Sequence, residues 1–340
     1  MCPAIHSVVR PSGLRFLTML LCWIPVMRTA AHGETRLPAL KTLMVTSTVD
    51  GSPQSCLLWT PSTAKTKETP LFVFLHSWSG DYRQDNAKWH RQAVKRGWIY
   101  LHPNFRGRND HPEACGSQLA RQDVIDAMDH VAARFSVDAR RVYLAGSSGG
   151  GHMTMLMSAY HPRRFSAASA WVGISDLQAW YRFHVDDQGR RGRYAQMIVD
   201  SCGGPPGISQ QIDRQYHERS PRHHLHQAGD LHLDLNAGVN DGHTGSVPVW
   251  HTLTAFNVVA AAGGHPTVSA EEIRQLSVNR RLTRPTALDR APDPSYGRQL
   301  QLRRVAGRAR VTIFDGGHES LPEAACTWLA RQSRLTSRAR

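Results

Sequence analysis

Residues 141–150 read RVYLAGSSGG, an apolar run that ends in a turn of glycine and serine. The apolar run is typical of a strand that is buried on both faces of a parallel sheet. Residues 150–160 are expected to form a helix that starts directly after the turn. Because a buried strand that leads straight into a helix is half of a βαβ unit, this stretch predicts an α/β fold.

Similar apolar runs on both sides of this stretch predict more strands of the same sheet. They cover residues 71–75, 97–101, 167–174, 231–237 and 311–314. Helices are predicted between or after them at residues 85–96, 118–135, 248–262 and 321–331. This alternation favours a mostly parallel sheet with helices on both faces. A β-hairpin is predicted further upstream, around the turn Asp50-Gly51.

Two irregular segments interrupt the alternation of strands and helices. The first, at about residues 176–230, is rich in Tyr, His, Arg and Gly, and it looks too polar to have a core of its own. The second lies at about residues 264–297. We therefore expect one α/β domain over residues 32–340, in which the first segment is a polar insertion over the active site.

The N-terminus has the charged, apolar and small-residue order of a secretory signal peptide. Arg10 and Arg15 precede the apolar run at residues 16–27, and small residues follow at positions 29–31. This run is shorter than the roughly 20 residues that a membrane span needs. The sequence predicts a signal peptide at residues 1–31, a secreted or periplasmic protein, and no stable membrane span after cleavage.

Four cysteines remain after the predicted cleavage: Cys56, Cys115, Cys202 and Cys326. An even number of cysteines in an exported chain favours disulfide bonds. Four cysteines allow three pairings, and the sequence does not choose among them.

The chain has a formal net charge of +14, carried mostly by arginine. The arginines are scattered along the chain, and no stripe of arginine alternates with aromatic residues as in a groove that binds single-stranded nucleic acid. No nucleic-acid partner is expected.

The turn that ends residues 141–150 matches the pattern G-x-S-x-G, with Gly146 and Gly150 around Ser148. Between a buried strand and a helix, this pattern is typical of a nucleophile elbow, which exposes the serine hydroxyl above the sheet. Ser148 is therefore the predicted nucleophile. Ser147 is the alternative, because it too has small neighbours.

A serine nucleophile needs a base, and the base needs an acid to orient it. Asp241 follows the predicted strand at residues 231–237, and His318 follows the one at residues 311–314. Catalytic groups gather at the carboxyl ends of strands in open α/β sheets. Asp241 and His318 are the predicted acid and base, and Asp234 and Asp315 are alternative acids.

The predicted oxyanion hole needs two backbone N–H donors. One comes from Gly149, directly after the nucleophile, and the other from Ser77 or Trp78 in the loop after residues 71–75. His223, His224 and His226 form a cluster in the first insertion, but a solvated polar segment is the favoured interpretation. No metal and no cofactor are expected.

These motifs together resemble the catalytic domain of the prolyl oligopeptidase family, from about residue 71 to residue 329. The resemblance rests also on Asn104-Phe105-Arg106-Gly107, on Gly238-Val239-Asn240-Asp241 and on Gly316-Gly317-His318-Glu319. It implies an α/β-hydrolase fold in which Ser148, Asp241 and His318 are nucleophile, acid and base. The chain would be a propeller-less member, because it is too short for the family's N-terminal β-propeller.

The expected activity is therefore that of a secreted serine hydrolase that cleaves a small peptide or ester substrate through an acyl-enzyme. An esterase that acts on carbohydrate or other small esters, without peptidase activity, is one alternative. A non-catalytic glycan-binding protein on the same fold is another. The oligomeric state stays open.

Overall fold

The structure is a computed structural model, and it describes residues 36–334. The predicted signal peptide at residues 1–31 lies outside the described residues, and so does most of the small N-terminal unit that ends at Arg36. The second unit, which begins at Leu37, holds every element described below.

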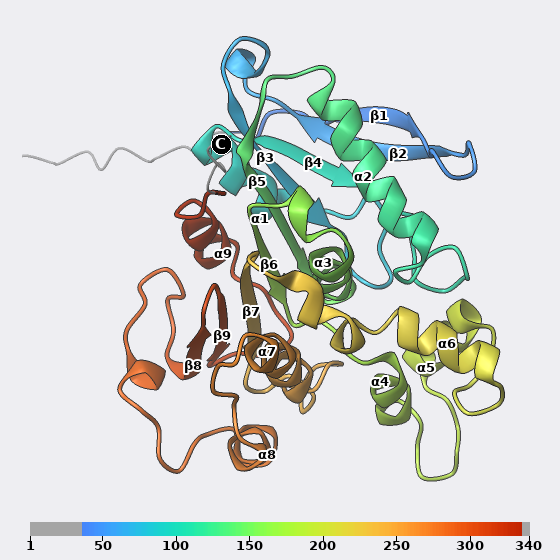
Figure 1. Ribbon diagram of the computed structural model, residues 1–340, viewed down its shortest axis with the longest axis vertical. Helices are drawn as coiled ribbons and strands as arrows, with labels where there is room; N and C mark the ends of the chain where they lie inside the picture. The colour runs from blue at the N-terminus through green and yellow to red at the C-terminus, as the bar shows by residue number, and fades with distance from the viewer. Residues whose placement is uncertain (1–35, 335–340) are drawn as a thin grey trace, which may run out of the picture. The chain divides into compact units, whose positions relative to one another are not determined.

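A sheet of nine strands runs through this unit in the order β1-β2-β4-β3-β5-β6-β7-β9-β8 (Figure 1). Its strands are β1 (Lys41–Thr46), β2 (Pro53–Trp59), β3 (Thr69–Leu75), β4 (Ile99–Pro103), β5 (Val137–Ser147), β6 (Ala167–Trp171), β7 (His232–Gly238), β8 (Leu300–Ala306) and β9 (Ala309–Phe314). The strands from β4 to β9 in this order are parallel, and β1, β2 and β8 add antiparallel pairs at the two ends. The prediction of a mostly parallel sheet is confirmed.

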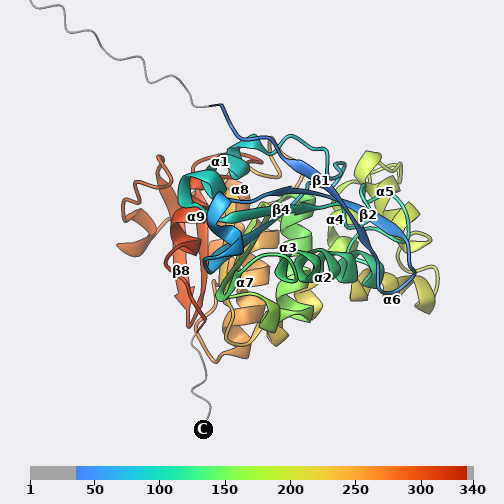
Figure 2. The same cartoon turned by 90° about the horizontal axis from the view of Figure 1, so that it is seen from above.

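Helices cover both faces of the sheet, as predicted. They are α1 (Ala87–Arg96), α2 (Gln118–Ala132), α3 (Gly149–Tyr160), α4 (Leu177–Phe183), α5 (Arg193–Cys202), α6 (Gln210–Glu218), α7 (Trp250–Ala262), α8 (Ala270–Asn279) and α9 (Pro322–Leu329). Short 3-10 helices lie at Ser62–Lys65, Pro162–Arg164, Pro221–His223, Leu225–Ala228 and Leu288–Arg290. Helices α1 and α9 contact each other on one face, and α2, α3 and α7 lie on the other (Figure 2).

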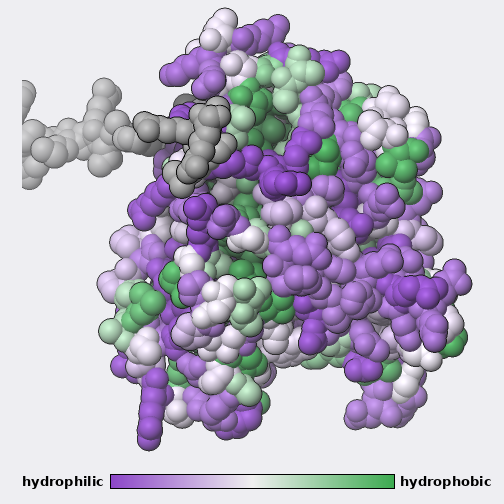
Figure 3. Space-filling model, in the orientation of Figure 1, coloured by the Kyte–Doolittle hydropathy of each residue, from purple (hydrophilic) through white to green (hydrophobic). Residues whose placement is uncertain are grey.

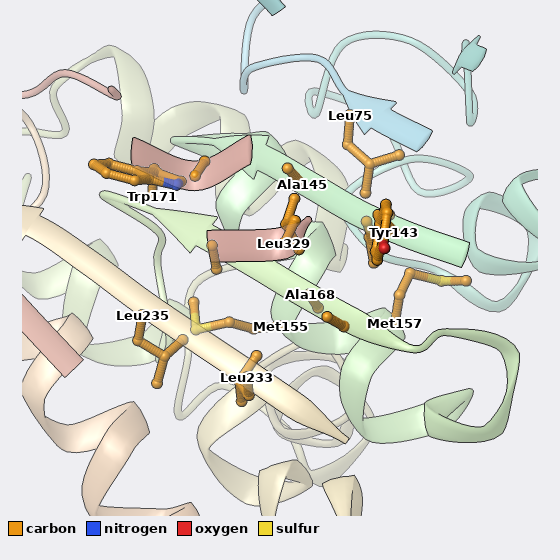
Figure 4. Packing of buried hydrophobic residues seen from close by; sticks show 14 of the residues in the cluster. Leu75, Tyr143, Ala145, Met155, Met157, Ala168, Trp171, Leu233, Leu235 and Leu329 are labelled. Carbon is orange, nitrogen blue, oxygen red and sulfur yellow. The ribbon is translucent and has the colours of Figure 1, made fainter. Parts of the chain in front are cut away.

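The main core forms where the central strands meet α3. All of the residues of this helix except Tyr160 are buried. Figure 4 shows Met155 and Met157 of α3 packed near Ala168 of β6, with Leu329 of α9 close to Ala145 of β5. Because β5 and α3 are both fixed by the core, the turn between them is held rigidly.

The first insertion contributes apolar side chains from three helices to the packing of the domain. Helices α4, α5 and α6 contact one another (Figure 1). Trp180, Ile198 and Tyr216, one from each helix, are buried in a second hydrophobic cluster that also includes Trp78 and Val247. The cluster is shared with Trp78 and Val247, which lie outside the insertion, so the insertion packs on the α/β domain and does not have a core of its own.

The second insertion is also more regular than predicted. It contains α8, whose N-terminus has a capping box in which Ser269 and Glu272 bond to each other's backbone N–H. Strand β8 follows and pairs with β9 as an antiparallel edge. Neither element was predicted from the sequence, although Ser269-Ala270-Glu271-Glu272 is the pattern of a capping box.

The expectation of disulfide bonds is wrong in this structure. Cys56, Cys115, Cys202 and Cys326 are all free thiols, and all four are buried. They pack as small apolar side chains within the two hydrophobic clusters. Burial raises the pKa of the Cys115 thiol to about 11.

The surface of the face shown in Figure 3 is mostly hydrophilic, with hydrophobic residues in small areas. No helix within residues 36–334 is long and apolar enough to cross a membrane.

Candidate active site

Ser148 lies in a sharp turn between the end of β5 and the start of α3. Its backbone φ of 59° and ψ of −117° are rare for a residue with a side chain, as expected of a strained nucleophile elbow. A Cβ at Gly146 would lie 2.3 Å from the carbonyl oxygen of Gly150. Gly146 must therefore be a glycine, because it lies against Gly150 across the turn.

Ser148, His318 and Asp241 form a continuous chain of hydrogen bonds. The Ser148 Oγ lies 2.9 Å from His318 Nε2, and His318 Nδ1 lies 2.8 Å from Asp241 Oδ2. In a neutral imidazole whose Nδ1–H donates to the carboxylate, Nε2 is free to accept the serine proton. This is the arrangement of a nucleophile, a base and an acid.

Asp241 is held in place by groups other than His318. Its side chain is buried, and its second oxygen accepts hydrogen bonds from the N–H groups of Gly242 at 3.0 Å and Val247 at 3.1 Å. These bonds fix the carboxylate toward the imidazole. The carboxylate follows β7 and the imidazole follows β9, which are neighbours in the sheet.

Gly245 packs behind the Asp241–His318 pair, and sequence reasoning missed it. A Cβ at this position would lie 2.3 Å from Asp241 Oδ1 and 2.6 Å from His318 Cβ. Any side chain here would therefore push the acid and the base apart. The one signal in the sequence is its position, because Gly245 follows the predicted acid Asp241 by four residues.

The alternative residues lie elsewhere. Asp234 is buried within β7 and accepts hydrogen bonds from Ser169 at 2.7 Å and Arg310 at 2.6 Å. Asp315 is exposed, directly after β9. Ser147 is the last residue of β5, and the hydroxyl that bonds to His318 belongs to Ser148.

The structure separates the two candidates for the second oxyanion donor. The N–H of Ser77 donates to Gln84 Oε1 at 2.8 Å, so this donor is already engaged. The backbone of Trp78 lies so close to Gly149 that a Cβ at Gly149 would be 2.3 Å from the Trp78 nitrogen. Within residues 36–334 the Trp78 N–H has no hydrogen-bond partner. Gly149 and Trp78 therefore offer adjacent backbone donors.

The segment Asn104–Gly107 contacts the loop after β3, since His76 Nε2 lies 2.7 Å from the carbonyl oxygen of Asn104. Phe105, Arg106 and Gly107 have φ values of 35°, 74° and 73°, so the chain turns sharply after β4. The buried Arg106 guanidinium bonds to Asp123 at 2.6 Å and to Asp50 at 2.8 Å. It thereby ties this loop to α2 and to the hairpin turn.

The histidine cluster of the first insertion is a stack of rings. The rings of His217 and His223 lie 4.2 Å apart, and His224 meets His217 edge-on at 5.2 Å. In the part of the chain that the structure describes, no group of three or more His, Cys, Asp or Glu residues could hold a metal ion.

A cavity of about 330 Å³ opens beside Ser148, and we call it the catalytic cavity. Trp78, Gln84, Asn86 and Trp89 line one part of it, with Tyr194 of the first insertion. A larger cavity of about 950 Å³ includes Ser166 and His232, at the amino ends of β6 and β7. It is therefore at the opposite end of the sheet from Ser148.

The fold and this site define a serine hydrolase of the α/β-hydrolase class. The family model described as prolyl oligopeptidase family matches residues 85–270, more than half of the 340 residues. The chain therefore belongs to the prolyl oligopeptidase family.

Solved structures of two other proteins have a similar fold. The chain is similar to the acylaminoacyl peptidase of Pyrococcus horikoshii, with a TM-score of 0.58 and 14% identity over 87% of this chain and 40% of that one. It is also similar to prolyl oligopeptidase B from Galerina marginata, with a TM-score of 0.54 and 16% identity over 70% and 34% of the two chains.

One curated relative is closer in sequence over a short stretch. Feruloyl esterase B of Neurospora crassa is 36% identical over 93 residues, which cover 24% of this chain and 31% of the esterase. The chain thus matches less than half of the length of each of these three relatives.

Proposed function

We propose that the chain is a secreted carboxylic ester hydrolase that uses Ser148, His318 and Asp241 as its catalytic triad. The observation that carries this proposal is the unbroken path of hydrogen bonds from the serine hydroxyl to the buried carboxylate. A serine alone is a weak nucleophile, and it needs a base at this distance to lose its proton.

In the first half of the reaction, His318 Nε2 accepts the proton of Ser148 while Oγ attacks the ester carbonyl. The carbonyl oxygen becomes an oxyanion, which accepts hydrogen bonds from the N–H groups of Gly149 and Trp78. His318 then donates its proton to the leaving alkoxide, the C–O bond breaks, and the acyl-enzyme remains. Water repeats the sequence and releases the acid.

Two observations support an ester as the substrate. A curated relative that is 36% identical over 93 residues is a feruloyl esterase. The catalytic cavity, of about 330 Å³, has the indole of Trp89 and the phenol of Tyr194 in its wall, which suits a small acyl group with an aromatic ring. The N-terminal sequence supports secretion.

A small peptide is the second candidate substrate, because the chain belongs to a family named for its peptidases. The same triad would then protonate an amine instead of an alcohol. A panel of para-nitrophenyl esters and acylated peptide para-nitroanilides separates the two, and we expect faster hydrolysis of the esters.

A fluorophosphonate probe tests the catalytic proposal itself, since it labels only an activated serine. We expect labelling of the wild type and of Ser147→Ala, and none of Ser148→Ala. An unlabelled wild type would overturn the enzyme proposal and favour a binding protein on the same fold. Labelling lost only in Ser147→Ala would move the nucleophile by one residue.

Secretion is tested by expressing the full chain with its own N-terminus in a bacterium that exports proteins. We expect mature protein outside the cytoplasm that starts close to residue 32. Uncleaved protein confined to the cytoplasm would contradict the signal peptide.

A further inference from the structure

Two side chains at the end of helix α4, in the first insertion, bond to the loop that carries the proposed catalytic acid. Trp180 Nε1 donates a hydrogen bond to the carbonyl oxygen of Ser246 at 2.7 Å, and His184 Nε2 lies 2.9 Å from the same oxygen. Trp180 and His184 are four residues apart, so they lie on the same side of the helix. One carbonyl of the acid loop is thus bonded twice to the insertion.

The tautomer of His184 follows from this contact. A carbonyl oxygen only accepts hydrogen bonds, so His184 Nε2 must carry a proton. Burial lowers the pKa of His184 from its ordinary value of 6.5, so the imidazole is neutral at pH 7 and its single N–H is the one on Nε2. His184 is therefore a neutral donor, as is the indole of Trp180.

Ser246 lies between two residues that contact the proposed acid. The N–H of Val247 donates to Asp241 Oδ1 at 3.1 Å. On the other side, a Cβ at Gly245 would lie 2.3 Å from the same Oδ1 and 2.6 Å from His318 Cβ. Residues 245–247 therefore pack behind the acid, and a shift of the Ser246 backbone would displace both contacts.

Trp180 also contacts the loop of the proposed oxyanion hole. Its ring meets the ring of Trp78 edge-on, with centroids 4.7 Å apart, and both side chains are buried. The backbone N–H of Trp78 is the proposed second oxyanion donor. The ring of Trp180 is also 5.1 Å from the ring of Tyr194, which lines the catalytic cavity. Trp180 therefore touches the acid loop, the oxyanion loop and the wall of the cavity.

From these contacts we propose that Trp180 and His184 are positioning residues, which hold the Ser246 carbonyl and thereby keep Asp241 in place to orient His318. The inference rests on the proposed hydrolase activity. Because a small displacement of a catalytic group is costly, the first insertion then takes part in the chemical step and does more than cover the cavity.

His184 allows a test with little effect on the core, because it is only partly buried. In His184→Gln the side-chain NH₂ can donate to the Ser246 carbonyl, whereas His184→Leu has no donor. On para-nitrophenyl acetate, we expect His184→Leu to lose about threefold in kcat with little change in KM, and His184→Gln to stay near the wild type. Equal kcat values in these two variants would overturn the role of His184.

Trp180→Phe removes the other donor and keeps an aromatic ring beside Trp78. Either donor alone can still hold the Ser246 carbonyl, so the two losses should not be independent. We expect the double variant Trp180→Phe/His184→Leu to lose at least about 30-fold in kcat, more than the product of the two single losses. A double variant as active as the wild type would overturn the proposal.

Tyr216→Phe is the matched control within the same insertion. Tyr216 is a buried aromatic residue of the same hydrophobic cluster, and its OH donates to the carbonyl of Gly204 at 3.0 Å, outside the acid loop. This variant also removes one hydrogen bond from an aromatic side chain to a backbone carbonyl. It should leave kcat unchanged, and a loss equal to that of the double variant would show that the insertion acts only through its general packing.

A spectroscopic signature reports the position of the acid without catalysis. The proton that His318 Nδ1 donates to Asp241 lies in a hydrogen bond to a buried carboxylate, and we expect its proton NMR resonance far downfield of the backbone amides. Asp241→Asn, which removes this bond, assigns the resonance. It should be present in the wild type and in His184→Gln, and be shifted or lost in the double variant.

The positioning proposal and the hydrolase proposal can fail separately. If Ser148 is not labelled and no ester is hydrolysed, the hydrolase proposal fails, while the resonance still shows whether Trp180 and His184 hold Asp241 against His318. If the wild type is active and the double variant keeps the resonance unchanged, only the positioning proposal fails. Should the double variant not fold, as judged by circular dichroism, the comparison of His184→Leu with His184→Gln decides.

Discussion

The backbone N–H of Ser77 and the side-chain Oε1 of Gln84 lie 2.8 Å apart, and this hydrogen bond holds the loop that carries Trp78. The Gln84 side chain lies across the loop, since a Cβ at Gly80 would be 2.4 Å from its Oε1. Gln84 therefore determines where the Trp78 N–H stands relative to Gly149. It is a positioning residue for the proposed oxyanion hole.

Replacing Gln84 with methionine keeps the length of the side chain and removes the acceptor. One hydrogen bond of this kind contributes about 0.5–1.5 kcal/mol, so we expect kcat on para-nitrophenyl acetate to fall about three- to tenfold while KM stays near its original value. Gln211→Met, on the exposed surface of α6, is the control. An unchanged kcat, or an equal loss in both variants, would show that Gln84 does not position the loop.

Asp241→Asn should preserve the fold and remove most of the activity. An asparagine fits the same space, but its NH₂ group cannot accept a hydrogen bond from His318 Nδ1–H, so the imidazole loses the tautomer that serves as a base. We expect kcat on para-nitrophenyl acetate to fall about 10³- to 10⁴-fold, while the circular dichroism spectrum stays unchanged. Asp234→Asn tests the alternative acid, and a larger loss of kcat there, in a folded protein, would reverse the assignment.

Gly245→Ala should separate the acid from the base. The added methyl group would stand 2.3 Å from Asp241 Oδ1, where no atom fits without movement. We expect a loss of kcat of at least 100-fold, because a small displacement of a catalytic group is costly. Gly317→Ala is a matched control next to His318, since its Cβ would lie 3.4 Å from the nearest atom, Thr244 Oγ1. Equal activities of the two variants would contradict a packing role for Gly245.

The elements that pack against the centre of the sheet could be predicted from the sequence. Buried parallel strands such as β3 consist of continuous apolar residues, and β5 is followed by a turn whose glycines mark the elbow. The predicted positions of Ser148, Asp241 and His318 followed from the ends of these strands. The structure brings their side chains into hydrogen-bond contact.

What the sequence did not reveal depends on contacts between distant segments. The engagement of Ser77 by Gln84 requires the loop to fold back on itself, and no spacing rule predicts it. The packing of Trp78 against Trp180, with ring centroids 4.7 Å apart, joins an early loop to the first insertion. The sequence of the insertion does not show which of its apolar residues pack against the rest of the domain.

Three buried histidines should make the fold sensitive to mild acid. Burial lowers the pKa of His102 and of His251 to about 3, and that of His152 to about 4, from the ordinary value of 6.5. The unfolded chain therefore binds protons below pH 6.5 that the folded chain does not bind. Their contribution to stability is fully present above pH 6.5 and is lost as the pH falls toward 4 and 3.

Each of these histidines should lower the free energy of unfolding by up to about 1.4 kcal/mol for each pH unit below 6.5. His152 offers a clean test, because its Nε2 lies 2.7 Å from the Arg219 carbonyl oxygen, and a glutamine amide can donate to the same acceptor without titrating. Between pH 7 and pH 5, urea unfolding of His152→Gln should show about 2 kcal/mol less loss of stability than the wild type. His265→Gln, at an exposed position, should lose as much as the wild type. If all three proteins lose the same free energy between these pH values, His152 is not the neutral buried group that its surroundings require.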